Sequence, residues 1–120
     1  MNQSELIAAT LARLIEAFQE AAHANTSAIE TGRHRVANRA FELLVQLAGE
    51  IRRRGTQGEM ALLQLLQSND AQVRLWAASY SLDLSPVEAE EVLTELSAGP
   101  PSLGRLTAEM TLRDWRERRE

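Results

Sequence analysis

The most informative stretch of the chain runs from Asp70 to Leu84 and reads DAQVRLWAASYSLDL. With successive residues about 100° apart, as in an α-helix, only Gln72, Ser79 and Asp83 form a clearly polar stripe. Apolar side chains cover most of the remaining circumference. The pattern predicts a helix that is buried on several sides, and such a helix requires neighbouring elements that pack around it.

Two long helices are predicted before this stretch. The first runs from Ser4 to Ala22, with Asn2 or Ser4 as its cap, and the polar residues 23–26 are expected to end it. The second opens with Ser27 and Glu30, which have the spacing of a capping box. It is expected to end at the arginines of residues 52–54 and at Gly55. Cations are favourable at the C-terminal end of a helix, and glycine readily adopts the left-handed conformation of the residue that follows the helix.

Three shorter helices complete the prediction. One covers Met60–Leu66, and a corner at residues 68–70 separates it from the central helix. The sequence Ser85-Pro86-Val87-Glu88 predicts the start of another, which reaches Leu96 and stops at Gly99-Pro100-Pro101. The last lies between Ser102 and Arg118. No segment alternates as a half-exposed strand does, so we expect an all-α fold of about six helices. Side chains expected to face the core include Ile7, Met60, Leu106 and Met110.

Length and composition place the chain among ordinary globular proteins. Its 120 residues, of which 44% are hydrophobic and 25% charged, suit a single domain over residues 1–120. The chain has no cysteine, and its start shows neither a basic segment nor an uninterrupted apolar run. We therefore expect a cytoplasmic protein without a signal peptide or a membrane span.

The charges limit the activities that we expect. A net charge of −4 argues against a general nucleic-acid binder, because such affinity depends on cations that neutralise phosphates. All 13 basic residues are arginine. The absence of lysine excludes Schiff-base chemistry on a lysine amine and the phosphate-binding lysine of a nucleotide loop.

The spacing of residues in the central stretch is similar to a known helical repeat. Consecutive short helix pairs are the unit of helical solenoids. The second-helix signature of HEAT and armadillo-like repeats is matched here, with Ala71 where those families usually have proline. The matching residues are Asp70, Val73, Arg74, Ala77, Ala78 and Leu82.

A longer resemblance covers most of the chain. Arg54-Gly55, the leucines of residues 62–66, the block Val73–Ala78 and the block Ala108–Trp115 resemble the small bacterial family called domain of unknown function twenty-nineteen. The resemblance implies a compact HEAT-like α-α superhelix. It implies no established activity, and therefore no catalytic residues.

Two charged surfaces are candidate partner-binding sites. Glu88, Glu91 and Glu95 share one face of their predicted helix, which carries no basic residue, and they are expected to form either an acidic strip for a basic partner or a solvated face paired with Arg105 or Arg113. A basic cluster near the start of the second helix is expected to form either a solvated polar face or a contact patch for an acidic protein or a nucleic-acid backbone. This cluster consists of Arg33, His34, Arg35, Asn38 and Arg39.

Four residues are assigned structural roles. Asp70 is a capping residue, and Arg74 is expected to be partly buried with a carboxylate or carbonyl partner, Asp70 being one candidate. The alternative for Arg74 is an anion-binding role. Trp76 and Trp115 are expected to pack in the core, although Trp76 borders the polar stripe, where an aromatic side chain could also anchor a partner.

The sequence supports neither a metal site nor a catalytic one. Glu20 and His23 have the spacing of di-iron bundles, but such sites need a second copy of that motif, and Glu30 with His34 is only a further pair at helical spacing. The chain has two histidines, no cysteine and no serine in a glycine-flanked elbow. We assign no cofactor and no catalytic residue.

These observations favour a non-enzymatic protein–protein interaction module of a bacterial cell, with an immunity-like or a regulatory role. The expected partner is another protein, and the chain itself is expected to be a monomer or a homodimer. The alternatives are a nucleic-acid-binding helical-repeat protein and a hydrolase with an unrecognised site. The nucleic-acid alternative requires the basic residues 33–39 and 52–54 to merge on one surface.

Overall fold

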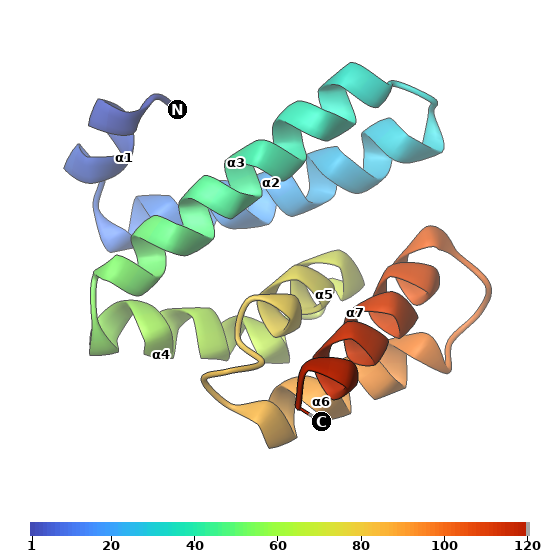
Figure 1. Cartoon of the computed structure of the whole chain (residues 1–120). Coiled ribbons are helices and arrows are strands. Elements are labelled where there is room, and N and C mark those ends of the chain that lie inside the picture. Colours follow the sequence, from blue (N-terminus) through green and yellow to red (C-terminus); the bar gives the residue numbers. More distant parts are fainter. Residues whose placement is uncertain (120) are drawn as a thin grey trace. The chain divides into compact units, whose positions relative to one another are not determined.

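The computed structural model describes residues 1–119 of the chain. These residues form seven α-helices and one short 3-10 helix but no strand (Figure 1), which confirms the predicted all-α class. No helix in this part of the chain has the length and apolarity that a membrane span requires. The elements are α1 (Gln3–Ala8), α2 (Leu11–Glu30), α3 (His34–Arg53), α4 (Thr56–Gln64), η1 (Leu65–Gln67), α5 (Ala71–Ser79), α6 (Pro86–Ser97) and α7 (Leu103–Arg119).

The chain divides into two compact units, one over residues 1–62 and one that starts at residue 63, so that the boundary lies within α4. In the N-terminal unit α2 packs along α3, and α1 contacts α3. In the C-terminal unit α5 contacts η1, α6 and α7, and α6 packs along α7. The single domain over residues 1–120 stays a prediction.

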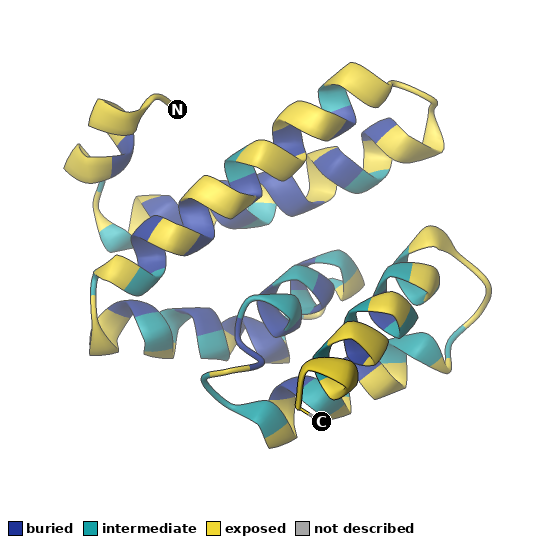
Figure 2. Ribbon diagram, in the orientation of Figure 1, coloured by how far each residue is buried: buried dark blue, intermediate teal, exposed yellow. Residues whose placement is uncertain are grey.

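An antiparallel hairpin of α2 and α3 forms the body of the N-terminal unit (Figure 1). Leu14, Phe18, Leu44 and Leu47 are fully buried in it, and the two helices bury the sides that face each other while their outer sides are exposed (Figure 2). Alanines fill the rest of the contact, and their small side chains let the two helices approach closely. The buried alanines are Ala17, Ala21, Ala22, Ala28, Ala37, Ala40 and Ala48.

The prediction of one helix from Ser4 to Ala22 is wrong. The chain leaves the helical conformation at Ala9, whose ψ is 149°, and Thr10 caps a new helix by accepting a hydrogen bond from the backbone N–H of Arg13 at 3.1 Å. A cap inside the predicted helix therefore divides it into α1 and α2. The predicted cap at Asn2 is confirmed, and its side chain forms a capping box with Glu5.

The helix end predicted at residues 23–26 is also wrong, because α2 continues to Glu30 and includes the predicted capping residue Ser27. Asn25 interrupts the apolar pattern there, yet it is buried and its Nδ2 donates to the carbonyl of Ala37 at 2.9 Å. A main-chain oxygen of the facing helix thus satisfies a polar side chain in the core. The turn lies instead at Gly32, whose φ of 73° favours glycine.

The end of α3 agrees with the prediction. The helix stops at Arg53 with two arginines in its last turn, and Gly55 has a φ of 75°. Gly58 in α4 then passes so close to α3 that a Cβ atom there would overlap the carbonyl oxygen of Ile51 and lie 2.9 Å from its carbonyl carbon. Packing of the first turn of α4 against the end of α3 therefore requires a glycine at position 58.

Arg54 joins the end of α3 to the turn between α1 and α2. Its Nε donates to the carboxylate of Glu50 at 2.9 Å, and the Glu50 side chain is only 7% exposed. Glu50 also accepts a hydrogen bond from Arg53 at 2.9 Å. The Nη2 of Arg54 donates to main-chain carbonyls that end α1, and one guanidinium therefore neutralises a buried carboxylate and satisfies a helix end. These carbonyls belong to Leu6, Ile7 and Ala9, at 3.1, 3.2 and 2.8 Å.

The central helix of the C-terminal unit is shorter than predicted. It spans Ala71–Ser79, and turns occupy residues 80–84. Asp70 caps it, because one side-chain oxygen accepts hydrogen bonds from the backbone N–H groups of Gln72 and Val73. The side chains that it buries are spread over more than half of its circumference, as expected for an enclosed helix, and they are Val73, Leu75, Ala77 and Ala78.

The last two helices lie close to their predicted bounds, but each differs in detail. Ser85 occupies the cap position of α6 without a side-chain cap hydrogen bond. In α7 the buried residues are Ala108 and Leu112, whereas Leu106 and Met110, two positions earlier, lie about 200° around the helix and are half exposed. The other predicted core residues that are exposed are Ile7 and Met60, at 60% and 58%.

Replacing Gly58 with alanine should destabilise the protein by about 1–3 kcal/mol, because the added methyl group overlaps main-chain atoms that cannot rotate away. Gly49 is the matched control, since it lies in the interior of α3 and an added methyl group there would meet no atom within 4 Å, so Gly49→Ala should stabilise by about 0.5–1 kcal/mol. Urea unfolding of both variants gives the comparison. Similar free energies of unfolding for the two variants would contradict the close approach.

Replacing Arg54 with alanine should cost about 3 kcal/mol, because it leaves the buried carboxylate of Glu50 without its main partner. Arg53→Ala is the control, since Arg53 is 65% exposed and contacts the same carboxylate, and its loss should cost less than about 1 kcal/mol. Unfolding in urea measures both losses, and hydrogen exchange should show faster opening of α1 in the Arg54 variant alone. Equal losses of stability in the two variants would contradict this role of Arg54.

Candidate functional site

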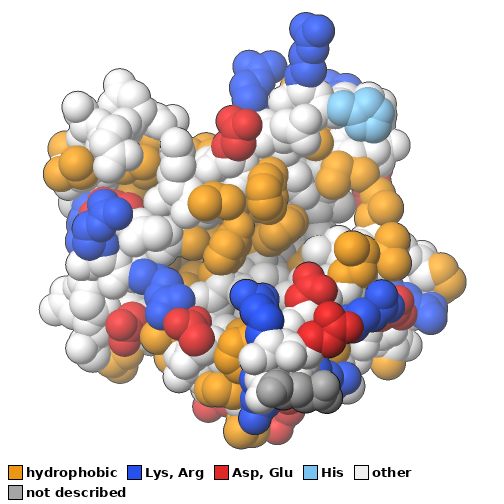
Figure 3. Space-filling model, viewed as in Figure 1, with side chains coloured by type: hydrophobic (Ala, Val, Ile, Leu, Met, Phe, Trp, Pro, Cys, Tyr) orange, Lys and Arg blue, Asp and Glu red, His pale blue; other side chains and the backbone are white. Residues whose placement is uncertain are grey.

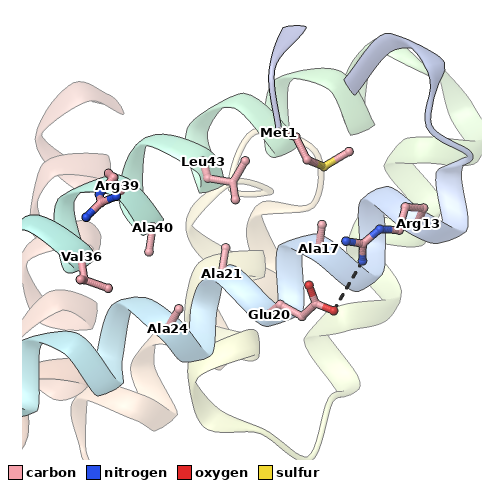
Figure 4. Close-up of a pocket in the computed structure, with 10 residues that line it drawn as sticks. All are labelled: Met1, Arg13, Ala17, Glu20, Ala21, Ala24, Val36, Arg39, Ala40 and Leu43. Atoms are coloured by element: carbon pink, nitrogen blue, oxygen red, sulfur yellow. Dashed lines mark hydrogen bonds and ion pairs between the residues drawn. The ribbon is translucent and has the colours of Figure 1, made fainter. Parts of the chain in front are cut away.

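A groove of about 480 Å³ lies between α2 and α3 in the N-terminal unit. Figure 4 shows its small apolar side chains, with Ala17, Ala21 and Ala24 on α2 opposite Val36 and Leu43 on α3. Ala17 and Ala21 are buried, whereas Val36 and Leu43 are half-buried. The groove therefore has a shallow aliphatic floor. The remaining lining residues are Met1, Arg13, Glu20, Arg39 and Ala40.

The two rims of this groove carry different charges. On the α2 rim Arg13 forms ion pairs with Glu16 at 2.8 Å and with Glu20 at 3.5 Å, so its charge is compensated. On the α3 rim Arg39 is exposed and has no carboxylate within 4.0 Å among residues 1–119. The groove therefore combines an aliphatic floor with one uncompensated cation.

The predicted basic cluster gathers at one end of the hairpin, where Figure 3 shows basic side chains and a histidine around the α2–α3 turn. All five of its residues are exposed. Helical spacing nevertheless divides them between two faces of α3, with Arg35 and Arg39 one turn apart on the side of the groove and His34 and Asn38 one turn apart on another side. Arg33 precedes the helix at its cap position. Only Arg39 lines the groove.

The second group of arginines does not join this cluster. Residues 33–39 lie at the start of α3 and residues 52–54 at its end, and a helix of 20 residues is about 30 Å long. Arg53 and Arg54 also hold Glu50. The merged basic surface that the nucleic-acid alternative requires is therefore not present in the N-terminal unit.

The predicted acidic strip lies along α6. Glu88, Glu91 and Glu95 are exposed and form no ion pair within the described residues, so the pairing expected with Arg105 or Arg113 does not occur. Arg105 binds Glu109 at 3.1 Å instead. Acidic and basic side chains are mixed on the visible side of α7 (Figure 3). The charged residues of α6, in contrast, are all glutamates.

Trp115 has a polar partner that the sequence did not identify, and Arg74 has a carbonyl partner, which is one of the two kinds expected. The indole Nε1 of Trp115 donates to Glu90 at 2.7 Å, and Arg119 donates to the same carboxylate at 2.8 Å while its guanidinium lies 5.7 Å from the centre of the Trp115 ring. Arg74 is half-buried and donates to the carbonyl of Ser68 at 2.7 Å, so its partner is a main-chain oxygen and not Asp70. The contacts of Trp115 therefore serve the packing of the C-terminal unit, whereas Arg74 keeps a charge without a carboxylate partner in the described residues.

The candidate metal pairs are not assembled into a site. Glu20 is engaged by Arg13, and Glu30 and His34 lie on different helices because the α2–α3 turn separates them. No group of three His, Asp or Glu side chains in residues 1–119 is arranged to hold a metal ion.

Sequence reasoning missed Asn25 and Arg54. Both are polar side chains that bind main-chain carbonyls of distant residues, at Ala37 for Asn25 and in the α1–α2 turn for Arg54. Asn25 could have been found by continuing the apolar period of α2 through it, since Ala21, Asn25 and Ala28 keep helical spacing. No local pattern identifies the carbonyls that Arg54 binds.

The comparisons with known proteins place the chain in a family. The model described as "Domain of unknown function (DUF2019)" matches residues 12–115. The chain belongs to this family. No curated protein matches the DUF2019 chain. The crystal structure of the protein RPA1889 from Rhodopseudomonas palustris is similar to it, with 27% sequence identity, a TM-score of 0.86 and 93% of each chain covered. The family resemblance expected from the sequence is therefore confirmed.

The single tyrosine of the DUF2019 chain provides a pH test of the C-terminal unit. Tyr80 stacks on Trp76 with ring centres 6.2 Å apart, and burial raises the pKa of its phenol above the ordinary 10.0. The Tyr80 phenol therefore loses its proton at a higher pH in the folded state than in the unfolded state. The free energy of unfolding is unaffected by this group below about pH 10 and falls as the pH rises beyond it. Ultraviolet titration of tyrosinate should give a higher midpoint in buffer than in urea. Equal midpoints would contradict the burial.

Proposed function

We propose that this DUF2019 chain is a non-enzymatic protein-interaction module whose α2–α3 groove accepts an amphipathic helix with acidic side chains. The observation that carries the proposal is the combination of an aliphatic floor with an uncompensated arginine at one rim. Grooves of this kind bind the apolar face of a helix, with anchors at helical spacing. The lining side chains are mostly aliphatic, which suits contact better than chemistry.

Charge supports an acidic partner for the groove. Arg39 and Arg35 are like charges one turn apart on an exposed face, and neither has a carboxylate partner in the described residues. The chain as a whole is acidic, with a net charge of −4, so this local positive region would select the orientation of an acidic helix. Glutamates on the partner would pair with Arg39 while its apolar residues cover the alanines.

A HEAT-like arrangement is supported by the consecutive helix pairs of the C-terminal unit, in which η1 contacts α5 and α6 packs along α7. The acidic strip on α6 is a second contact surface, suited to a basic partner. We propose a cytoplasmic location, a monomer or homodimer, and an immunity-like or regulatory role.

Two synthetic helical peptides test the groove. They share one leucine face at helical spacing, and the polar face carries glutamates in one peptide and lysines in the other. The purification tag is placed at the C-terminus of the chain, because Met1 lines the groove. The glutamate peptide should bind and the lysine peptide should not. Fluorescence anisotropy at low and high salt measures the affinity of both peptides, and high salt should weaken binding of the glutamate peptide.

Arg39→Glu should weaken binding of the glutamate peptide by about tenfold or more. Arg113→Glu is the matched control, because Arg113 is an equally exposed arginine on α7 that does not line the groove, and it should leave the affinity unchanged. Equal binding of the two peptides, or equal effects of the two substitutions, would refute the proposed function.

A further inference from the structure

The C-terminal unit contains a second cavity that differs in chemistry from the α2–α3 groove. It has a volume of about 290 Å³ and lies where the start of α5, the end of α6 and the start of α7 meet. Its size is near the lower end of the range of small-molecule sites, about 300–1,000 Å³. The cavity therefore suits a small metabolite.

Two opposite charges line this cavity without neutralising each other. Arg74, on α5, is half-buried and has only the Ser68 carbonyl as a hydrogen-bond partner in the described residues, at 2.7 Å. Glu95, on α6, lines the same cavity and forms no ion pair there. The two charged groups are thus more than 4.0 Å apart. A guanidinium and a carboxylate that line one cavity without pairing are complementary to a ligand that carries both charges.

The third charge on the lining is already compensated. Arg105 forms an ion pair with Glu109 at 3.1 Å and donates to the carbonyl of Gly99 at 3.3 Å. A ligand therefore meets one available cation, Arg74, and one available anion, Glu95. This balance favours a zwitterion over a dianion such as phosphate.

The rest of the lining provides an apolar wall and room for polar atoms. Leu75 and Leu96 line the cavity from α5 and α6. At Gly104 a Cβ atom would lie 3.4 Å from Nε2 of Gln72 and 3.7 Å from Oγ of Ser102, so the missing side chain leaves space beside two polar groups. The cavity thus combines two charges, neutral polar atoms and an aliphatic surface.

We infer that this cavity binds a small zwitterion of the α-amino-acid type. Its carboxylate pairs with Arg74, its ammonium group pairs with Glu95, and an aliphatic side chain packs against Leu75 and Leu96. This site is independent of the α2–α3 groove, because no residue lines both.

Titration calorimetry with leucine and two compounds that each lack one of its charged groups tests the inference. Leucine carries both charges, 4-methylpentanoate lacks the ammonium group and 3-methylbutylamine lacks the carboxylate. Leucine should bind the intact chain saturably, and each truncated compound should bind at least about tenfold more weakly. No saturable binding of leucine at millimolar concentration, or equal binding of 4-methylpentanoate, would overturn the inference.

Glu95→Gln should reduce the affinity for leucine to that for 4-methylpentanoate while leaving 4-methylpentanoate binding undiminished. Glu91→Gln is the control, because Glu91 is an exposed glutamate one turn earlier on α6 that does not line this cavity, and it should bind leucine as the parent chain does. Both positions are exposed, so both variants should fold, which circular dichroism checks. Equal behaviour of the two variants would overturn the inference, whatever the peptide experiment on the groove gives.

Discussion

The N-terminal unit depends on one guanidinium. Arg54 binds the buried carboxylate of Glu50 and the carbonyls that end α1, and these carbonyls lie more than 40 residues earlier in the chain. A helix as short as α1 has few internal hydrogen bonds, and its last carbonyl groups need partners from elsewhere. A buried carboxylate likewise needs a cation. Because one side chain meets both needs, the position of α1 and the start of α2 follow from the end of α3.

The groove follows from how α2 is held along α3. Arg54 and the Thr10 cap define where α2 begins, and the bond from Asn25 to the Ala37 carbonyl ties its far end to the start of α3. Between these points the contact consists largely of alanines, which bury well but extend little. Larger side chains such as Leu43 stay at the edge of the contact and are half-buried. The groove is therefore a product of the packing that holds the hairpin together.

Sequence patterns predict the helical class and the turns that have strong local signals, such as Gly55 after the arginines and the Asp70 cap. They fail where the hydrogen-bond partner of a side chain comes from a residue that is distant in the sequence. A polar residue that interrupts an apolar stripe predicts a loop at Asn25, and only the facing carbonyl explains its burial. The basic cluster is predicted at the correct end of α3, but the groove beside Arg39 depends on alanines of α2, whose alignment with α3 is a tertiary property.

The exclusive use of arginine has a structural basis in this chain. Arg54 binds a carboxylate and three carbonyls at once, and Arg105 binds a carboxylate and a carbonyl. Arg119 binds Glu90 while its flat guanidinium lies over the ring of Trp115. The planar guanidinium with five donors can make such combined contacts, whereas the compact ammonium of lysine cannot stack and reach two acceptors in the same way. Arginines engaged in this manner are therefore structural, whereas Arg39 and Arg74, which have no carboxylate partner in the described residues, are among the cations available to a ligand or a partner protein.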